Sequence, residues 1–479
     1  MSKNLGNKAK SGLGWDVAGT FLKQISVLVV TIILARLLTP EEFGVVGMAM
    51  VFISLSQVFI DVGLSQGVIQ SKTNNQVVYS TIFYINIIAG IAIGLVGFLA
   101  APFVADFFEK PEVLNVLRWL CLMPFISSLG NMHTTLYTKE LNFKILTYRI
   151  VISTVVGGVV GIVMAYLNYG VYALVGQQLT TISLSVLFLW IRSNWTPTLE
   201  FSYSQIKGIL NFSMYIFFDN LLRRFFQKID TLFIGKYFSA AALGYYSRAE
   251  SLNAQIDQYT SSSLMKVLFP AFSKIQDDSD RFEKAYFKLF NLAAFLGIFS
   301  GGVMFFLSEN IILLLLGDKW IPSIIIFQIL VFRLIISPFG GIMGKSLLAK
   351  GFSKEKFKVS QVQRLILLSP IIVGFYYGLT EFTVMLVIAH GIGFLINVWV
   401  VNKLLKISLR KQLLTFVKPL LPFIVLLIPF YYFNLQEHSL YFFVIFVIIQ
   451  ILYAYTLKLE GFLLIKNMIL STVSKLKKR

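Results

Sequence analysis

The chain has 479 residues, of which 57% are hydrophobic and 14% charged, and its mean hydropathy of +0.76 excludes a water-soluble domain of ordinary composition. The formal net charge is +19, but no basic segment has the pattern of a DNA-binding helix, so nucleic acid is not expected as a partner. The single cysteine, Cys121, excludes an intrachain disulfide and a multi-cysteine metal site.

Apolar segments long enough to cross a bilayer recur along the whole chain. They predict an all-α polytopic membrane protein with about fourteen transmembrane helices. The spans are expected near residues 15–38, 43–69, 79–103, 113–137, 146–168, 170–192, 209–236, 242–272, 286–307, 322–349, 362–379, 382–403, 418–433 and 440–458. The first span follows a basic start without a small-residue cleavage site, which predicts that it is not a signal peptide.

The order of the spans predicts two lobes and a C-terminal addition. The expected parts are an N-terminal six-helix lobe (1–192), a cytoplasmic inter-lobe linker (193–208), a C-terminal six-helix lobe (209–403), and two extra transmembrane helices with a basic cytoplasmic tail (404–479).

An internal repeat supports this division. A shift of 200 residues aligns ARLLTPEEFG (35–44) with GKYFSAAALG (235–244), so that Gly44 meets Gly244 and Lys23 meets Arg223. A further match, at a shift of 211 residues, sets LMPFISSLG against IISPFGG. We interpret the repeat as two pseudo-symmetric lobes around a central cavity, as in alternating-access transporters. Chance similarity between apolar helices is the alternative.

The distribution of basic residues predicts the orientation. Of the 42 Lys and Arg, 30 fall on one side of the fourteen-span arrangement, and the opposite loops hold only Arg36, Lys110, Lys236 and Lys319. Both termini are therefore expected in the cytoplasm.

Charged residues inside the predicted spans indicate a binding site, because an unpaired charge at mid-bilayer costs roughly 2.5 to 3.5 kcal/mol. Basic residues outnumber acidic ones there, which favours an anionic guest. The candidate substrate-binding residues are Lys23, Arg223, Arg224, Lys228, Arg248, Lys266 and Arg333. The candidates for ion coupling are Asp61, Asp219, Glu250 and Asp257.

An alternative reading is that these charges pair with one another or reach the headgroups. Asp219 and Arg223, four residues apart on one helix, are the clearest example of such a pair. The histidines His133, His390 and His438 lack ligand spacing, so neither a metal site nor a cofactor is expected.

Several segments resemble the polysaccharide transporter (Wzx-type) flippases of the multidrug/oligosaccharidyl-lipid/polysaccharide exporter superfamily. The resemblance is carried by ARLLTPEEFGVVGMA, FIDVGLSQGVIQ, STIFYINI, FKILTYRIVISTVVGGVVGIVMA and KIDTLFIGKYFSAAALGYYSRA. It covers about the first 400 residues, fades over the final two spans, and is most similar to the colanic-acid and teichuronic-acid exporter branch.

The resemblance implies a flippase that moves an undecaprenyl-pyrophosphate-linked oligosaccharide to the outer leaflet for surface polysaccharide biosynthesis. It also implies basic residues on the first helices of both lobes, which singles out Lys23 and Arg223. The partners that the resemblance implies are the lipid-linked oligosaccharide and the membrane lipids. A polysaccharide polymerase and a chain-length regulator are further candidate partners.

Two other functions are less consistent with the sequence. A multidrug/cation antiporter of the same superfamily needs an acidic or aromatic cavity, whereas the charges here are mostly basic. A membrane polysaccharide polymerase or ligase needs catalytic groups on a large outer loop, and none of the predicted outer loops is long. We therefore expect a transporter that is not an enzyme.

Overall fold

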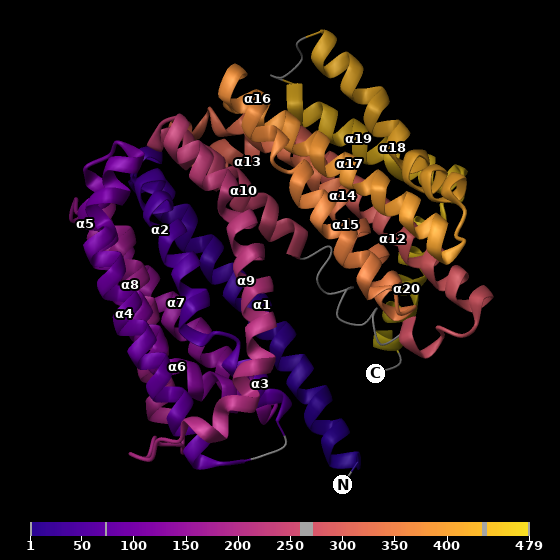
Figure 1. Cartoon of the computed structure of the whole chain (residues 1–479). Helices are drawn as coiled ribbons and strands as arrows, with labels where there is room; N and C mark the ends of the chain where they lie inside the picture. The colour runs from indigo at the N-terminus through magenta and orange to yellow at the C-terminus, as the bar shows by residue number, and fades with distance from the viewer. Residues whose placement is uncertain (1, 72–73, 259–271, 434–437, 478–479) are drawn as a thin grey trace. The chain divides into compact units, whose positions relative to one another are not determined.

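The protein folds into helices joined by short turns, as the computed structural model in Figure 1 shows. The structure describes residues 2–71, 74–258, 272–433 and 438–477, and no strand occurs among them. The chain divides into two units, residues 1–247 and 248–479, which we describe one at a time.

The first unit begins at the N-terminus and extends into the tenth helix. Its helices are α1 (Ser2–Leu37), α2 (Pro40–Asp61), α3 (Leu64–Gln70), α4 (Gln76–Phe108), α5 (Glu112–Leu120), α6 (Leu122–Lys139), α7 (Phe143–Tyr166), α8 (Val171–Arg192), α9 (Tyr203–Tyr237) and the start of α10 (Ala240–Asp257). Helix α7 packs against α1 and α8, and α6 packs against α4 and α8 (Figure 1).

The second unit contains the end of α10 and the C-terminal helices. These are α12 (Ser279–Phe306), α13 (Ser308–Leu315), the short η2 (Asp318–Trp320), α14 (Ser323–Ala349), α15 (Ser353–Ile366), α16 (Ser369–Tyr377), α17 (Leu379–Leu405), α18 (Leu409–Tyr432), α19 (Ser439–Thr456) and α20 (Glu460–Lys477). Helix α12 lies at the centre, in contact with α14, α18, α19 and α20.

The helices confirm a multi-pass, all-α membrane protein. Among the described residues, 12 helical segments are long and apolar enough to cross a bilayer, and each coincides with a predicted span. The two remaining predicted spans are α9, which has 35 residues, and the segment that starts with α10 and continues into residues 259–271, outside the described ranges. Their charged side chains lower their hydropathy, so composition alone does not detect them.

The boundary between the two units differs from the predicted boundary between the lobes. The predicted boundary is the linker 193–208, whereas the two units meet between Ser247 and Arg248. Helix α9 packs against α2, α3 and α4 of the first unit. The lobe boundaries rest on the sequence repeat and stay a prediction.

The linker between α8 and α9 is bound to the start of α4. The Trp195 indole donates a hydrogen bond to Gln76 Oε1 at 2.7 Å, and the Thr198 amide donates to Ser80 Oγ at 2.9 Å. The Trp195 ring also packs edge-on against His133, with ring centroids 5.2 Å apart. These contacts fix the direction in which α9 leaves the first six spans.

The second predicted span, expected from residue 43, begins at Pro40 and is broken near its end. Thr39 and Glu42 form a capping box, in which the Thr39 amide donates to Glu42 Oε2 at 2.6 Å. The helix stops at Val62 and Gly63, whose φ angles are 44° and 77°. A positive φ is strained for a β-branched residue, so surrounding contacts must hold this break in place.

The predicted tail after the last span is a helix, α20. Its first residue, Glu460, accepts a hydrogen bond from Asn291 Nδ2 of α12 at 2.7 Å. Aromatic rings fill the space between α12, α18 and α19. There the centroid of the Phe306 ring lies within 6 Å of the ring centroids of Phe423, Phe430 and Phe446. The two C-terminal spans and α20 are therefore packed against the core of their unit.

The equivalent glycines of the repeat lie at a close crossing of α2 and α10. A Cβ atom at Gly44 would lie 1.7 Å from the carbonyl oxygen of Ala240, and one at Gly244 would lie 1.9 Å from that of Pro40. At a shift of 200 residues, Gly44 corresponds to Gly244 and Pro40 corresponds to Ala240. Each helix therefore makes the same contact with the other. This symmetry agrees with the repeat in the sequence, and it requires glycine because two backbones touch.

Ion pairs surround the same crossing. Lys110 Nζ lies 2.9 Å from Glu41 Oε1, and Lys236 Nζ lies 2.8 Å from Glu109 Oε1. The hydrogen bond from Lys236, followed by its charge, lowers the pKa of the Glu109 carboxyl. Both pairs are exposed to solvent, so each contributes little to stability.

Gly44→Ala is expected to destabilise the protein, because the new methyl group would force α2 away from the Ala240 backbone. Overpacking of this kind costs about 1 to 3 kcal/mol. The measurement is the thermal unfolding temperature of the purified protein in detergent. Gly47→Ala is the matched control on the same helix, since its Cβ would meet only Leu243 Cδ2 at 3.4 Å. Equal unfolding temperatures for the two variants would contradict the assignment.

Candidate functional site

A cavity of about 370 Å³ with a mainly apolar wall and several polar side chains lies within the second unit, between α14, α15 and α17. Arg333 and Ser337 come from α14, Gln363 from α15, and His390 and Asn397 from α17. The sequence pattern singled out Arg333 among these. Helix α14 contains Pro338 and extends beyond it to Ala349.

Two acidic residues of α10 bind the side chains of α14. Glu250 accepts a hydrogen bond from the Arg333 guanidinium in an ion pair, and Asp257 accepts one from Ser337 Oγ at 2.6 Å. The Arg333 and Glu250 side chains are 21% and 31% exposed, so the pair is largely shielded from solvent. Arg333, Glu250 and Asp257 were all predicted candidates, and the structure brings them together through α10 and α14.

These contacts match the alternative in which charges of the spans pair with one another. Breaking a buried ion pair by removing one partner leaves the other charge uncompensated, which is strongly destabilising. Arg333 therefore has a structural role in joining α14 to α10, and its charge is already balanced by Glu250.

His390 faces the same cavity with a defined tautomer. Its Nδ1 lies 2.8 Å from the Leu386 carbonyl oxygen, which can only accept a hydrogen bond. Nδ1 therefore carries the proton, and Nε2 is the nitrogen that can accept one. His390 is part of the cavity wall, and its Nε2 remains available to a second hydrogen-bond partner.

Asp61, the candidate on the second span, stabilises the break in that span. Its Oδ1 accepts hydrogen bonds from the Ser65 amide at 3.0 Å and from Ser65 Oγ at 2.6 Å. Ser65 Oγ in turn accepts one from Thr135 Oγ1 of α6 at 2.7 Å. Asp61 thus caps α3 after the strained turn at Val62, which accounts for an acidic residue at this depth.

The basic candidates of the first unit lie on exposed surfaces. Lys23 of α1 is exposed, as are Arg223 and Arg224 of α9, and Lys228 is partly exposed. The Arg223 guanidinium donates a hydrogen bond to Asn220 Oδ1, one turn earlier on the same helix. Asp219 is exposed beside them.

Two further candidates belong to the segment that starts with α10. Arg248 is partly buried on α10. Lys266 lies outside the described residues. Whether any of the seven basic residues binds substrate stays a prediction.

The sequence analysis missed Arg149. It was counted as a cytoplasmic charge, but it lies within α7, where its Nη1 donates to Thr134 Oγ1 of α6 at 2.6 Å. A basic residue near the end of an apolar segment is usually a headgroup anchor, so its position alone did not distinguish the two roles. Gln363, which donates to the Gly393 carbonyl oxygen at 2.8 Å, was also missed because an isolated glutamine carries no pattern.

Spans that keep charged and polar groups around an internal cavity define a multi-pass membrane transport protein. The model of the family described as "Polysaccharide biosynthesis protein" matches residues 33–325. This match covers more than half of the chain, and the chain belongs to that family.

The relatives agree with this membership. The lipopolysaccharide biosynthesis protein WzxC of Escherichia coli (strain K12) is 24% identical over 373 residues, which is 78% of this chain and 76% of WzxC. The teichuronic acid biosynthesis protein TuaB of Bacillus subtilis (strain 168) is 24% identical over 421 residues, which is 86% of each chain. The resemblance to polysaccharide exporters is therefore confirmed, and the chain is a membrane transport protein rather than an enzyme.

Solved structures share the fold at low sequence identity. The lipid II flippase MurJ in an inward closed conformation has a TM-score of 0.73 at 16% identity, covering 93% of this chain and 99% of that one. An inward-facing multidrug resistance transporter of the MATE family has a TM-score of 0.64 at 17% identity, covering 81% and 96%. These similarities confirm the two-lobed helical fold class.

Arg333→Gln is expected to destabilise the protein by about 2 kcal/mol or more, because Glu250 would remain shielded without its partner. The double variant Arg333→Gln with Glu250→Gln should recover most of the loss. A double-mutant cycle on thermal or denaturant unfolding measures the coupling. Additive losses in the two single variants would show that the pair is not coupled. Lys358→Gln, on the exposed side of α15, is the control.

Proposed function

We propose that this protein moves a lipid-linked oligosaccharide, carried on undecaprenyl pyrophosphate, from the inner to the outer leaflet of the bacterial cytoplasmic membrane. Membership in the polysaccharide biosynthesis family supports the general class of cargo. The name of the Rhizobium meliloti relative, succinoglycan biosynthesis transport protein ExoT, agrees with transport in such a pathway. Alternating access of the two lobes is the mechanism we expect from the repeat.

The observation that carries this proposal is the group of basic side chains on α9. Arg223 and Arg224 are exposed within a segment that we assign to the membrane, and a charge exposed to hydrocarbon would be costly. A water-filled passage removes that cost. The planar guanidinium groups match the oxygens of a pyrophosphate in pairs.

The candidates contribute differently to this proposal. Arg333 is balanced by Glu250, so binding an anion there would require exchange of partners. Lys23, Arg223 and Arg224 are exposed and can contact a charged ligand directly. We therefore assign the first contact with the pyrophosphate to these three residues.

The crossing of α2 and α10 is a suitable closure for one end of the passage. Gly44 and Gly244 bring the two helices into backbone contact there. The nearby pairs Lys110–Glu41 and Lys236–Glu109 are weak enough to separate during a cycle. By the distribution of basic residues we assign this end to the outer face of the membrane.

A membrane potential that is negative inside would favour outward movement of an anion, by about 2.3 kcal/mol per charge per 100 mV. Coupling to protons or sodium would use Asp61, Asp219, Glu250 or Asp257. Asp61, Glu250 and Asp257 already accept hydrogen bonds from neighbouring side chains. The potential alone is therefore the simpler driving force.

The orientation can be tested with a single cysteine. Ser353→Cys in a Cys121→Ala background is expected to resist an impermeant thiol reagent in intact cells, because Ser353 begins α15 at the basic face of the protein. Glu112→Cys in the same background, at the start of α5, should be labelled. The reverse pattern of labelling would overturn the orientation.

Arg223→Ala is expected to reduce export at least tenfold, and Arg223→Lys to restore it only partly, because the ammonium keeps the charge and loses the planar fork. The assay is surface polysaccharide in a strain that lacks its flippase, with the protein level in the membrane measured in parallel. Lys207→Ala, an exposed cation near the start of α9, is the matched control.

The same assay separates binding from internal pairing. If Arg223 serves only to balance Asp219, the double variant Asp219→Asn with Arg223→Gln should export normally. Full export by the Arg223→Ala protein would exclude Arg223 from the site.

A further inference from the structure

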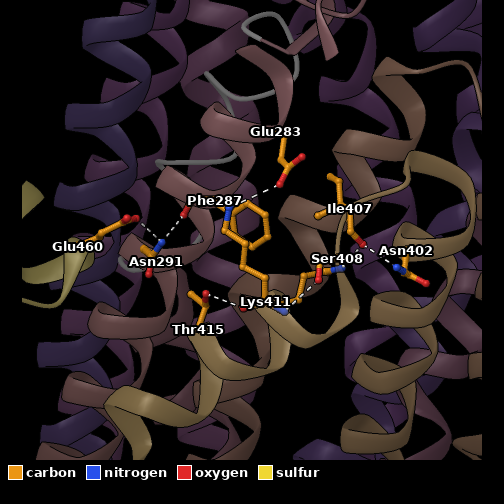
Figure 2. Close-up of polar contacts among 10 residues, drawn as sticks. Glu283, Phe287, Asn291, Asn402, Ile407, Ser408, Lys411, Thr415 and Glu460 are labelled. Atoms are coloured by element: carbon orange, nitrogen blue, oxygen red, sulfur yellow. Dashed lines mark hydrogen bonds and ion pairs between the residues drawn. The ribbon is translucent and has the colours of Figure 1, made fainter. Parts of the chain in front are cut away.

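A second cavity, of about 440 Å³, lies where α12, α18 and the turn between α19 and α20 meet. It is separate from the cavity at Arg333, with which it shares no lining residue. Its lining comprises Asn291, Phe295, Ser408, Arg410, Lys411, Leu414, Thr415, Lys418, Pro419, Leu457, Lys458, Leu459, Glu460 and Gly461. Figure 2 shows the polar contacts along one side of it.

The charge of this cavity is strongly positive. Four of its lining residues are basic and only Glu460 is acidic. Arg410 and Lys418 are exposed on α18, and Lys458 is exposed in the turn after α19. Helix α18 and the turn after α19 thus both contribute positive charge to this cavity.

Two of the charged side chains are held in position (Figure 2). Lys411 Nζ lies 4.1 Å from the centre of the Phe287 ring and 3.5 Å from Glu283 Oε1. The Glu460 carboxylate accepts a hydrogen bond from Asn291 at 2.7 Å. The Glu460 carboxylate of the lining is therefore bound to an amide, and Lys411 is paired with Glu283. The exposed cations Arg410, Lys418 and Lys458 define the field in the cavity.

Lys458 has a backbone conformation in which glycine is the usual residue. Lys458 has φ 48°, and the Leu459 amide donates to the Ala454 carbonyl oxygen at 3.0 Å, which is a Schellman ending for α19. Glycine is the usual residue at this position, because a side chain costs roughly 1 kcal/mol there. The chain places a lysine in the strained position, and its charge faces the cavity wall.

The surroundings of the cavity are those of a membrane interface. Leu414, Leu457 and Phe295 contribute apolar walls, and α18 and α19 continue from here as transmembrane spans. Helix α20 combines apolar residues with Lys466, Lys475 and Lys477, as interfacial helices do. From these surroundings we infer that the cavity lies at the level of the lipid headgroups.

We propose that this cavity binds the phosphate headgroup of an anionic phospholipid. The positive charge matches the phosphate, and the apolar walls match the first carbons of the acyl chains. The bound lipid would hold α18 and α20 against α12. The proposal does not depend on the cargo, because none of these residues belongs to the candidate transport site.

The test uses the full-length chain in detergent, titrated with phosphatidylglycerol and read by native mass spectrometry. Arg410→Gln, Lys418→Gln and Lys458→Gln combined should weaken binding of phosphatidylglycerol about tenfold or more. Lys284→Gln, Lys354→Gln and Lys358→Gln combined remove the same charge from exposed positions outside the cavity and should leave most binding intact. Phosphatidylcholine, which carries no net charge, should bind weakly to all three proteins.

Lys458→Gly separates a lost ligand contact from a folding defect. It relieves the positive φ, so thermal stability without lipid should stay equal or rise, while binding of phosphatidylglycerol falls severalfold. Equal loss of binding in the two triple variants, or unchanged binding in Lys458→Gly, would overturn the site. Displacement of the lipid by inorganic pyrophosphate at equal concentration would overturn the phospholipid assignment.

Discussion

The constraint on which this structure depends is the cost of leaving a polar group without a partner inside hydrocarbon. At the break in the second span, Asp61 meets this constraint because it accepts two hydrogen bonds from Ser65. The second unit satisfies it through Arg333 with Glu250, and through Ser337 with Asp257. Each of these contacts joins two helical segments, so the groups that are costly to bury also fix the packing.

Much of the fold could be predicted because it depends on local properties. A span needs a sufficient length of apolar residues, and the start of α2 needs only the pattern Thr39-Pro-Glu-Glu42. The break at Val62 could not be predicted, because a valine in that backbone conformation is held by tertiary contacts. The helix α20 was also missed, because its segment was predicted only as a basic cytoplasmic tail.

The candidate site was predicted as a set of charges and not as an arrangement. Arg333 and Glu250 are 83 residues apart, and their contact depends on how α10 and α14 are rotated about their axes. That rotation follows from packing along the whole helix. Lys458 and Lys418 were likewise used only to predict orientation, because the turn that brings Lys458 to the cavity lined by α18 is not visible in the pattern of residues.

The repeat shows which features are shared by both halves of the sequence and which are not. The crossing at Gly44 and Gly244 is the same in both, since each glycine contacts the backbone opposite the other. The charged pairs are not: at a shift of 200 residues, Glu250 and Asp257 correspond to Met50 and Gln57. A contact between two backbones tolerates only glycine, so both copies must keep it. The positive charge at Lys23 and Arg223 is present in both halves, whereas the two acids that contact α14 have no acidic counterpart in the first half.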